Sequence, residues 1–219
     1  MTRASFIKLA ALLLCAARSG PVHADEAELQ WSARPLGGVA TWHEETTSGL
    51  ALAGVAGTSL GVSYGVSHKL DLGAEVLALA TTKAAFEGST IIYDGSLPLG
   101  EVGDRLQRQT VSTFLMLGPT WRYGVDWVPV VTVAAGGGMR LRTEGVFEMT
   151  RVRPMEKRVE KGFDLAALGR VGIERRVTRR LTVGGYLSLL STWAPSVPLF
   201  GSASLSLGVS YVHYPRFWR

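Results

Sequence analysis

Apolar and polar residues alternate with a period of two through most of this chain. Near its C-terminal end, one set of alternate positions holds Ala203, Leu205, Leu207, Val209 and Tyr211, and the other holds Ser202, Ser204, Ser206, Gly208 and Ser210. Successive side chains of an extended strand point to opposite faces. The pattern therefore predicts a strand with one apolar face and one face of small polar residues.

The same alternation predicts six more strands, within residues 52–66, 70–80, 111–121, 131–141, 163–173 and 181–189. A first strand over 29–42 alternates poorly, and Pro35 and Gly37-Gly38 predict a bulge or kink in it. The chain therefore contains eight predicted strands of roughly a dozen residues each, a length that can cross a bilayer at a tilt.

The connections between these strands are short and long in turn. Short ones fall at 67–69, 124–126 and 177–179, and longer ones near 43–49, 87–107, 144–162 and 194–201. Short turns at one end and long loops at the other are typical of outer-membrane barrels. We therefore predict an all-β fold, an eight-stranded antiparallel up-and-down transmembrane β-barrel. The 87–107 connection is interpreted as a mobile surface loop.

Charge decides which face of each strand points inward. The faces rich in Leu and Val carry almost no charge, whereas the faces rich in Gly and Ser carry the ionisable residues. The interior of an eight-stranded barrel is narrow, so small residues with a few long charged ones fill it best, and the apolar faces then meet lipid. The predicted interior charges are Glu75, Arg122, Arg140, Arg142, Asp164, Arg170 and Glu174.

By their height above the turns, Glu75 and Arg170 lie at similar depth, and Arg122 and Glu174 form a lower layer. Enclosed charges need partners or water. They form either a structural plug or the salt bridges of a gated pore. Arg140 and Arg142 lead into the 144–162 connection, which is either a clamp for lipopolysaccharide phosphates or a charge-compensated strand extension beyond the membrane.

Aromatic residues gather near the predicted strand ends. The tryptophans form two predicted girdles, with Trp31, Trp121, Trp127 and Trp218 near the short turns and Trp42 and Trp193 near the long loops. Amphipathic rings prefer the headgroup boundary of a bilayer. Their placement is independent support for a barrel in a membrane.

Residues 1–24 have the features of a signal peptide, and 25–219 form the predicted barrel domain. Arg3 and Lys8 precede an apolar run, and Val22-His23-Ala24 is a small-x-small cleavage site. Lipid attachment at Cys15 is an alternative that Leu14, a large residue before the cysteine, disfavours. Removal of three bases with this segment lowers the formal charge from +5 to about +2. The remaining charges are mixed in sign, so we expect no nucleic-acid partner.

The segment Leu60-Gly-Val-Ser-Tyr-Gly-Val-Ser-His-Lys-Leu-Asp-Leu-Gly-Ala-Glu-Val76 is typical of the strand–turn–strand units of small outer-membrane barrels. Over 25–219 the chain resembles the eight-stranded family of the OmpA-type transmembrane domain. The resemblance implies a monomer in the bacterial outer membrane, in contact with membrane lipids, lipopolysaccharide and the assembly machinery. Family members end on an aromatic residue that this machinery reads. Here Tyr211 or Trp218 takes that place, because the chain ends on Arg219.

The sequence assigns no catalytic, cofactor or metal residue, and no enzyme activity is expected. We expect a structural, surface-binding or lipid-interacting role, with a narrow pore for small solutes as the alternative. A lipid A-modifying enzyme is a third hypothesis, for which His43, followed by two acids and three hydroxyl residues over 44–48, is the candidate near the outer rim.

Overall fold

The computed structural model describes residues 28–43, 50–94, 97–124, 127–148, 156–194 and 197–213, and their regular structure is entirely β. The strands are β1 (Leu29–His43), β2 (Leu50–Ser67), β3 (Leu70–Thr81), β4 (Ala84–Asp94), β5 (Leu97–Arg122), β6 (Trp127–Glu148), β7 (Glu156–Arg176), β8 (Leu181–Ala194) and β9 (Val197–His213). Within these ranges, no helix is long and apolar enough to cross a membrane.

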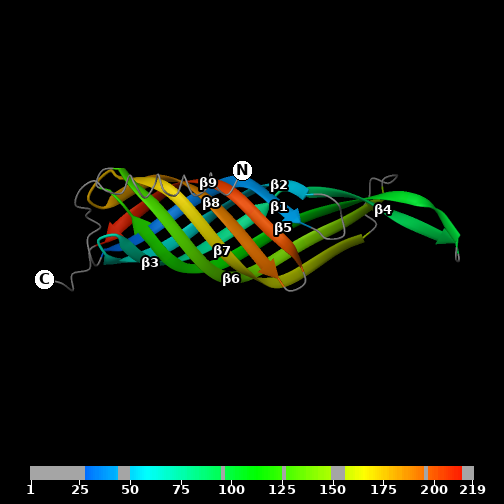
Figure 1. Ribbon diagram of the computed structural model, residues 1–219, viewed down its shortest axis with the longest axis horizontal. Coiled ribbons are helices and arrows are strands. Elements are labelled where there is room, and N and C mark those ends of the chain that lie inside the picture. The colour runs from blue at the N-terminus through cyan, green and yellow to red at the C-terminus, as the bar shows by residue number, and fades with distance from the viewer. Residues whose placement is uncertain are drawn as a thin grey trace, which may run out of the picture.

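Eight of the strands close into a barrel, as the sequence predicts. Their order is β3-β2-β1-β9-β8-β7-β6-β5, and pairing of β3 with β5 completes the ring (Figure 1). Every pair in the ring is antiparallel. The remaining strand, β4, pairs with the outer part of β5 and lies outside the ring.

The strands are strongly staggered around the ring. Cross-strand partners traced from Glu75 through β5 and β6 reach β7 at Ala166. Traced the other way, through β2, β1, β9 and β8, they reach β7 at Arg176, ten residues away. Closure with such a stagger requires the strands to tilt against the barrel axis. Residues far apart in the sequence are thereby brought to one height.

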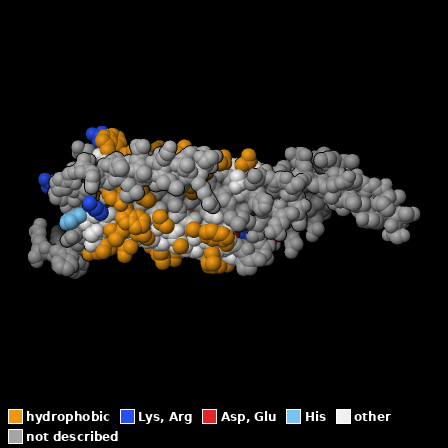
Figure 2. Space-filling view, in the orientation of Figure 1, with side chains coloured by type: hydrophobic (Ala, Val, Ile, Leu, Met, Phe, Trp, Pro, Cys, Tyr) orange, Lys and Arg blue, Asp and Glu red, His pale blue; other side chains and the backbone are white. Residues whose placement is uncertain are grey.

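The predicted face assignment is confirmed along the strands. The outward positions carry large apolar side chains, such as Leu207 at 75 % and Met139 at 70 % exposure. On β9, the four alternate serines Ser204, Ser206, Ser202 and Ser210 are all buried inside the barrel. Figure 2 shows the outward apolar side chains, here called the apolar belt, gathered along the face of the barrel that is in view.

The predicted bulge in the first strand is wrong. β1 keeps one register against β2 over its whole length and the same register against β9 on both sides of Pro35. Its alternation is regular but hidden in the sequence, because the outward positions between Trp31 and Val39 hold Ala33, Pro35 and Gly37, whereas Leu36 points inward and is buried.

The interpretation of residues 87–107 as a mobile loop is also wrong. β4 and the first half of β5 form a hairpin, paired from Ala84↔Arg108 to Asp94↔Leu97. The local signals were a β-branched run at Thr90-Ile91-Ile92 and the Asp94-Gly95 turn dipeptide. The outer parts of β6 and β7 continue to the pair Val146↔Glu156, so the 144–162 connection is largely a strand extension. These strands project well beyond the rest of the barrel (Figure 1).

Close approach of β5 and β6 requires glycine at several positions. A Cβ at Gly136 would overlap the carbonyl oxygen of Leu115, and one at Gly138 would overlap that of Thr113. By contrast, a Cβ at Gly169 on β7 would meet no atom within 4 Å. Gly136 and Gly138 therefore serve strand packing, whereas Gly169 does not.

We predict that Gly136→Ala destabilises the barrel by about 1–3 kcal/mol, because the added methyl group forces the two backbones apart. Gly169→Ala is the matched control and should change stability much less. The measurement is the urea dependence of unfolding in detergent micelles. Equal midpoints for the two variants would contradict this account of the glycine run.

Candidate functional site

The candidate site is the barrel interior, which is divided into zones along the axis. The order of residues along the strands gives the order of the zones. Leu77 and Leu79 follow Glu75 toward the loop end, and Leu168 lies between Arg170 and Asp164. Two layers of charge occupy the half near the short turns. An apolar cluster lies above them, and a group of arginines lies beyond that cluster at the loop end.

The lower charge layer is centred on Arg122. Its guanidinium forms ion pairs with Asp71 and, over 3.1 Å from Nε to Oε2, with Glu174. The Tyr186 hydroxyl donates to the other Glu174 oxygen at 2.7 Å. Four strands, β3, β5, β7 and β8, thus meet through one connected network. A lower pair, Glu28 with Arg176 at 2.8 Å, lies toward the short turns.

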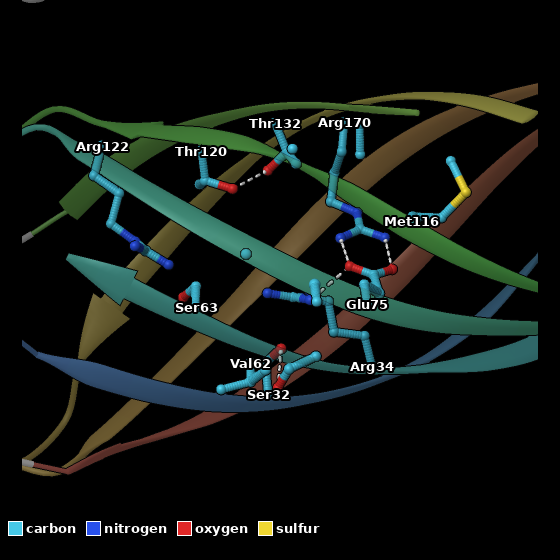
Figure 3. A pocket seen from close by; sticks show the side chains of 15 residues that line it. Ser32, Arg34, Val62, Ser63, Glu75, Met116, Thr120, Arg122, Thr132 and Arg170 are labelled. Carbon is cyan, nitrogen blue, oxygen red and sulfur yellow. Dashed lines mark hydrogen bonds and ion pairs between the residues drawn. The ribbon is translucent and has the colours of Figure 1, made fainter. Parts of the chain in front are cut away.

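The upper charge layer is centred on Glu75. Arg170 donates to its two oxygens at 2.7 and 2.6 Å, and Arg34 Nη1 donates to Oε2 at 3.2 Å (Figure 3). Arg170 Nε also donates to Ser188 Oγ at 3.0 Å, which fixes the guanidinium plane. Glu75 and Arg170, which strand heights placed at similar depth, are therefore direct partners.

Arg34 is a member of this network that the sequence did not indicate. Its guanidinium lies over the Tyr186 ring, with Cζ 5.1 Å from the ring centroid, and so joins the two layers. The only available signal was its position two residues before Leu36 on the same face of β1, and that face was obscured by the weak alternation of the strand. With Arg34 included, Arg34, Arg122 and Arg170 balance Asp71, Glu75 and Glu174 in charge.

A small cavity lies between the two charge layers (Figure 3). Its volume is about 40 Å³, and Arg34, Glu75, Arg122, Arg170 and the hydroxyls of Thr120 and Thr132 are among its lining groups. The two threonine hydroxyls are 3.0 Å apart. A polar space of this size has room for about three waters. The lower half of the interior is therefore suited to hydration, although its charges are paired.

Above the charge layers, an apolar cluster fills the interior. Its large members are Leu36, Val55, Leu77, Leu79, Phe114, Met116, Leu168 and Leu190. Phe114 and Met116 are at most 1 % exposed. The sequence interpretation assigned large apolar residues to the lipid face and missed this cluster. Strand parity was the available signal, because Leu77 lies two residues from Glu75 and Leu168 two residues from Arg170.

Arg140 and Arg142 lie inside the barrel at its loop end, and each side chain is less than 10 % exposed. Arg140 Nε is 2.9 Å from Asp164 Oδ2, and the two guanidiniums lie 3.8 and 3.9 Å from Glu160. Both arginines therefore face acids on the neighbouring strand β7. This arrangement fits the charge-compensated strand extension.

The predicted girdle residues lie at the ends of the apolar belt where they are described. Trp31 and Trp127 are more than half exposed near the short turns, Trp121 is half-buried beside them, and Trp193 is 45 % exposed near the loops. Trp42 belongs to β1, but its side chain and all of Trp218 lie outside the described residues. His43 ends β1, and the 44–48 segment that follows it is likewise outside them. Among described residues, no three His, Cys, Asp or Glu side chains form a potential metal site.

We predict that Glu75→Gln destabilises the barrel by about 3–5 kcal/mol, since it leaves two buried guanidiniums without their shared carboxylate. Lys69→Gln, at an exposed turn residue, is the control for loss of one charge. Unfolding in urea should also show that Arg170→Gln added to Glu75→Gln costs less than the two single changes together. Strict additivity would show that the two residues are not coupled.

No protein-family model and no curated protein sequence matches this chain. Among solved structures, the chain is similar to the attachment invasion locus protein Ail of Yersinia pestis, with 11 % identity, a TM-score of 0.46, and coverage of 86 % of this chain and 99 % of that one. Neisserial surface protein A shows 13 % identity, a TM-score of 0.43, and coverage of 85 % and 99 %. The N-terminal β-barrel domain of Pseudomonas aeruginosa OprF shows 12 % identity, a TM-score of 0.41, and coverage of 86 % of this chain and 98 % of that one. Because these TM-scores lie below 0.5, they assign no role or ligand to this chain.

Proposed function

We propose that this chain is an integral β-barrel of the bacterial outer membrane with a closed interior, and that it acts through its surface. One observation carries the proposal. The closed ring exposes a continuous belt of Leu, Val and aromatic side chains and encloses its ionised groups. A soluble barrel of this size has the reverse arrangement, with charges outside and large apolar residues inside.

The backbone supports the same environment. In hydrocarbon every N–H and C=O must be bonded within the protein, and for a sheet only a closed ring achieves this. Here β3 pairs with β5 over eleven residues, so no edge is open across the apolar belt. The aromatic residues at the belt's ends then lie where headgroups meet water. The signal-peptide features of residues 1–24 support export to this membrane.

The interior supports a plug better than a pore. Glu75 and its two arginines bridge the lumen from β1, β3 and β7, and the apolar cluster lies directly above. An ion passing through would have to break a paired layer and then enter a dry one. The polar cavity below is the specific feature in favour of the alternative, a narrow pore for small solutes.

A surface role follows from the strand extensions. β4 to β7 rise beyond the loop end of the belt as a small sheet, and β4 is its edge strand. An exposed edge on a rigid base is a common platform for binding another molecule. We therefore propose a monomer that contacts lipids, lipopolysaccharide and the assembly machinery, with a structural or ligand-binding role and no enzyme activity.

The first test is membrane insertion. Refolded protein should enter liposomes, resist alkaline extraction, and run at different positions on a gel with and without heating, because the apolar belt needs lipid or detergent. Protein that stays soluble and monodisperse without detergent would exclude the proposed function.

The second test is conductance in planar bilayers. The wild-type barrel should give no stable channel, because the paired charges and the apolar cluster close the lumen. A combined Phe114→Ala and Met116→Ala variant should raise the frequency of open events. Stable wild-type conductance would favour the pore and contradict the plug.

A further inference from the structure

The turn end of the barrel carries exposed bases beside exposed aromatic rings. Arg175, Arg179 and Arg180 all lie at the β7–β8 connection, and all three are exposed. Trp127 on β6 and Tyr211 on β9 flank them. We call these five residues the turn-side basic patch. Figure 2 shows Lys and Arg side chains at this end of the molecule, at the border of the apolar belt.

The patch is ordered by specific contacts. Arg175 is the cross-strand partner of Trp127, and its Cζ lies 5.2 Å from the ring centroid on the outer face. Arg180 Nη1 lies 3.4 Å from the Tyr211 hydroxyl. The turn between these arginines is held by Thr178, whose Oγ1 accepts from the backbone N–H groups of Arg180 and Leu181 at 3.3 and 3.1 Å. The guanidiniums of Arg175 and Arg180 are therefore each held beside an aromatic ring at this end of the barrel.

Among the described residues at the short-turn end, the exposed charged side chains are all basic. Among the described residues near the short turns, the acids Glu28, Asp71 and Glu174 are all buried, and each is bound to an arginine inside or at the mouth of the barrel. Lys69 adds another exposed base at the β2–β3 turn. Arg175, Arg180 and Lys69 therefore have no described acid beside them at the surface that borders the apolar belt.

The position of the patch along the barrel axis indicates which kind of ligand it meets. Trp127 and Tyr211 are 61 % and 45 % exposed and occupy the end of the apolar belt, where rings meet lipid headgroups in a bilayer. Guanidinium groups at that level face phosphates, which they bind through two parallel hydrogen bonds. Anionic headgroups also attract basic residues at a membrane surface. Zwitterionic headgroups carry a compensating cation that opposes the arginines.

We infer that the turn-side basic patch binds the phosphate groups of anionic phospholipids in the leaflet that faces the short turns. The inference rests on the proposed function, because it needs the belt to be embedded. Arg175, stacked on Trp127, contacts the headgroup from the outer wall, and Arg180, beside Tyr211, contacts it from the turn. The site anchors the short-turn end of the barrel at a fixed depth.

The test is a titration of brominated phosphatidylglycerol into the full chain in zwitterionic micelles, followed by quenching of tryptophan fluorescence. Brominated phosphatidylcholine is the reference lipid. Wild type should bind phosphatidylglycerol more tightly, and high salt should weaken this preference. Combined Arg175→Gln and Arg180→Gln should weaken binding about 25-fold, at about fivefold for each arginine.

The matched control is Lys83→Gln with Lys161→Gln, which removes two exposed bases near the loop end. It should leave the lipid preference unchanged, and heat-dependent gel mobility shows that both variants are folded. Equal wild-type binding of the two lipids, or an equal loss in the control, would overturn the inference whatever the arginine variant does. Displacement by millimolar inorganic phosphate would identify a site for free phosphate and would also overturn it.

Insertion into liposomes is scored first with the same wild-type preparation. A chain that fails to insert contradicts the proposed function. A chain that inserts but shows no preference for phosphatidylglycerol contradicts the lipid site alone.

Discussion

The narrow lumen of an eight-stranded ring is the constraint on which the rest of this structure depends. An eight-stranded barrel has room for side chains and little else. Every inward position must therefore be small, apolar and well packed, or charged and paired. Three groups of residues meet this requirement in different ways: the serines on β9, the apolar cluster that includes Leu77 and Phe114, and the ion pairs of Glu75.

Charge pairing in this lumen links strands that are distant in the sequence. Glu75 on β3 receives guanidiniums from β1 and β7, so one carboxylate connects both sides of the ring. Isolated, such charges would be costly to bury, and together they balance. Replacing a buried ion pair by apolar residues of similar volume is often neutral in stability. The Glu75 ion pairs therefore matter equally for fixing which strands face one another.

The two ends of the barrel differ because different numbers of residues extend beyond the belt. At the short-turn end, the described chain reversals are tight, and bases and aromatic rings lie together at the border of the apolar belt. At the loop end, β4 to β7 continue their pairing well past the ring, and Arg140 and Arg142 turn toward acids on β7. The short-turn end therefore stops at the border of the apolar belt, whereas the loop end extends beyond it.

Period-two patterning by itself determined the strand phases, the closed antiparallel ring and the outward direction of residues such as Leu205 and Phe163, because a strand has only two faces and one of them here is too polar for lipid. It also placed Glu75 and Arg170 at one depth by counting along strands from the turns. It misassigned β1, where Ala33, Pro35 and Gly37 at outward positions conceal the phase. It also misassigned the 87–107 segment, whose Gly, Pro and acidic residues conceal a short β-branched run and an Asp-Gly dipeptide. Only the tertiary structure decided that Leu77, Phe114 and Leu168 meet in one cluster above the charge layers, and that Arg34 joins Glu75. The reason is physical: pattern fixes the face of a residue within its own strand, whereas its neighbours across the lumen depend on the ten-residue stagger with which the ring closes.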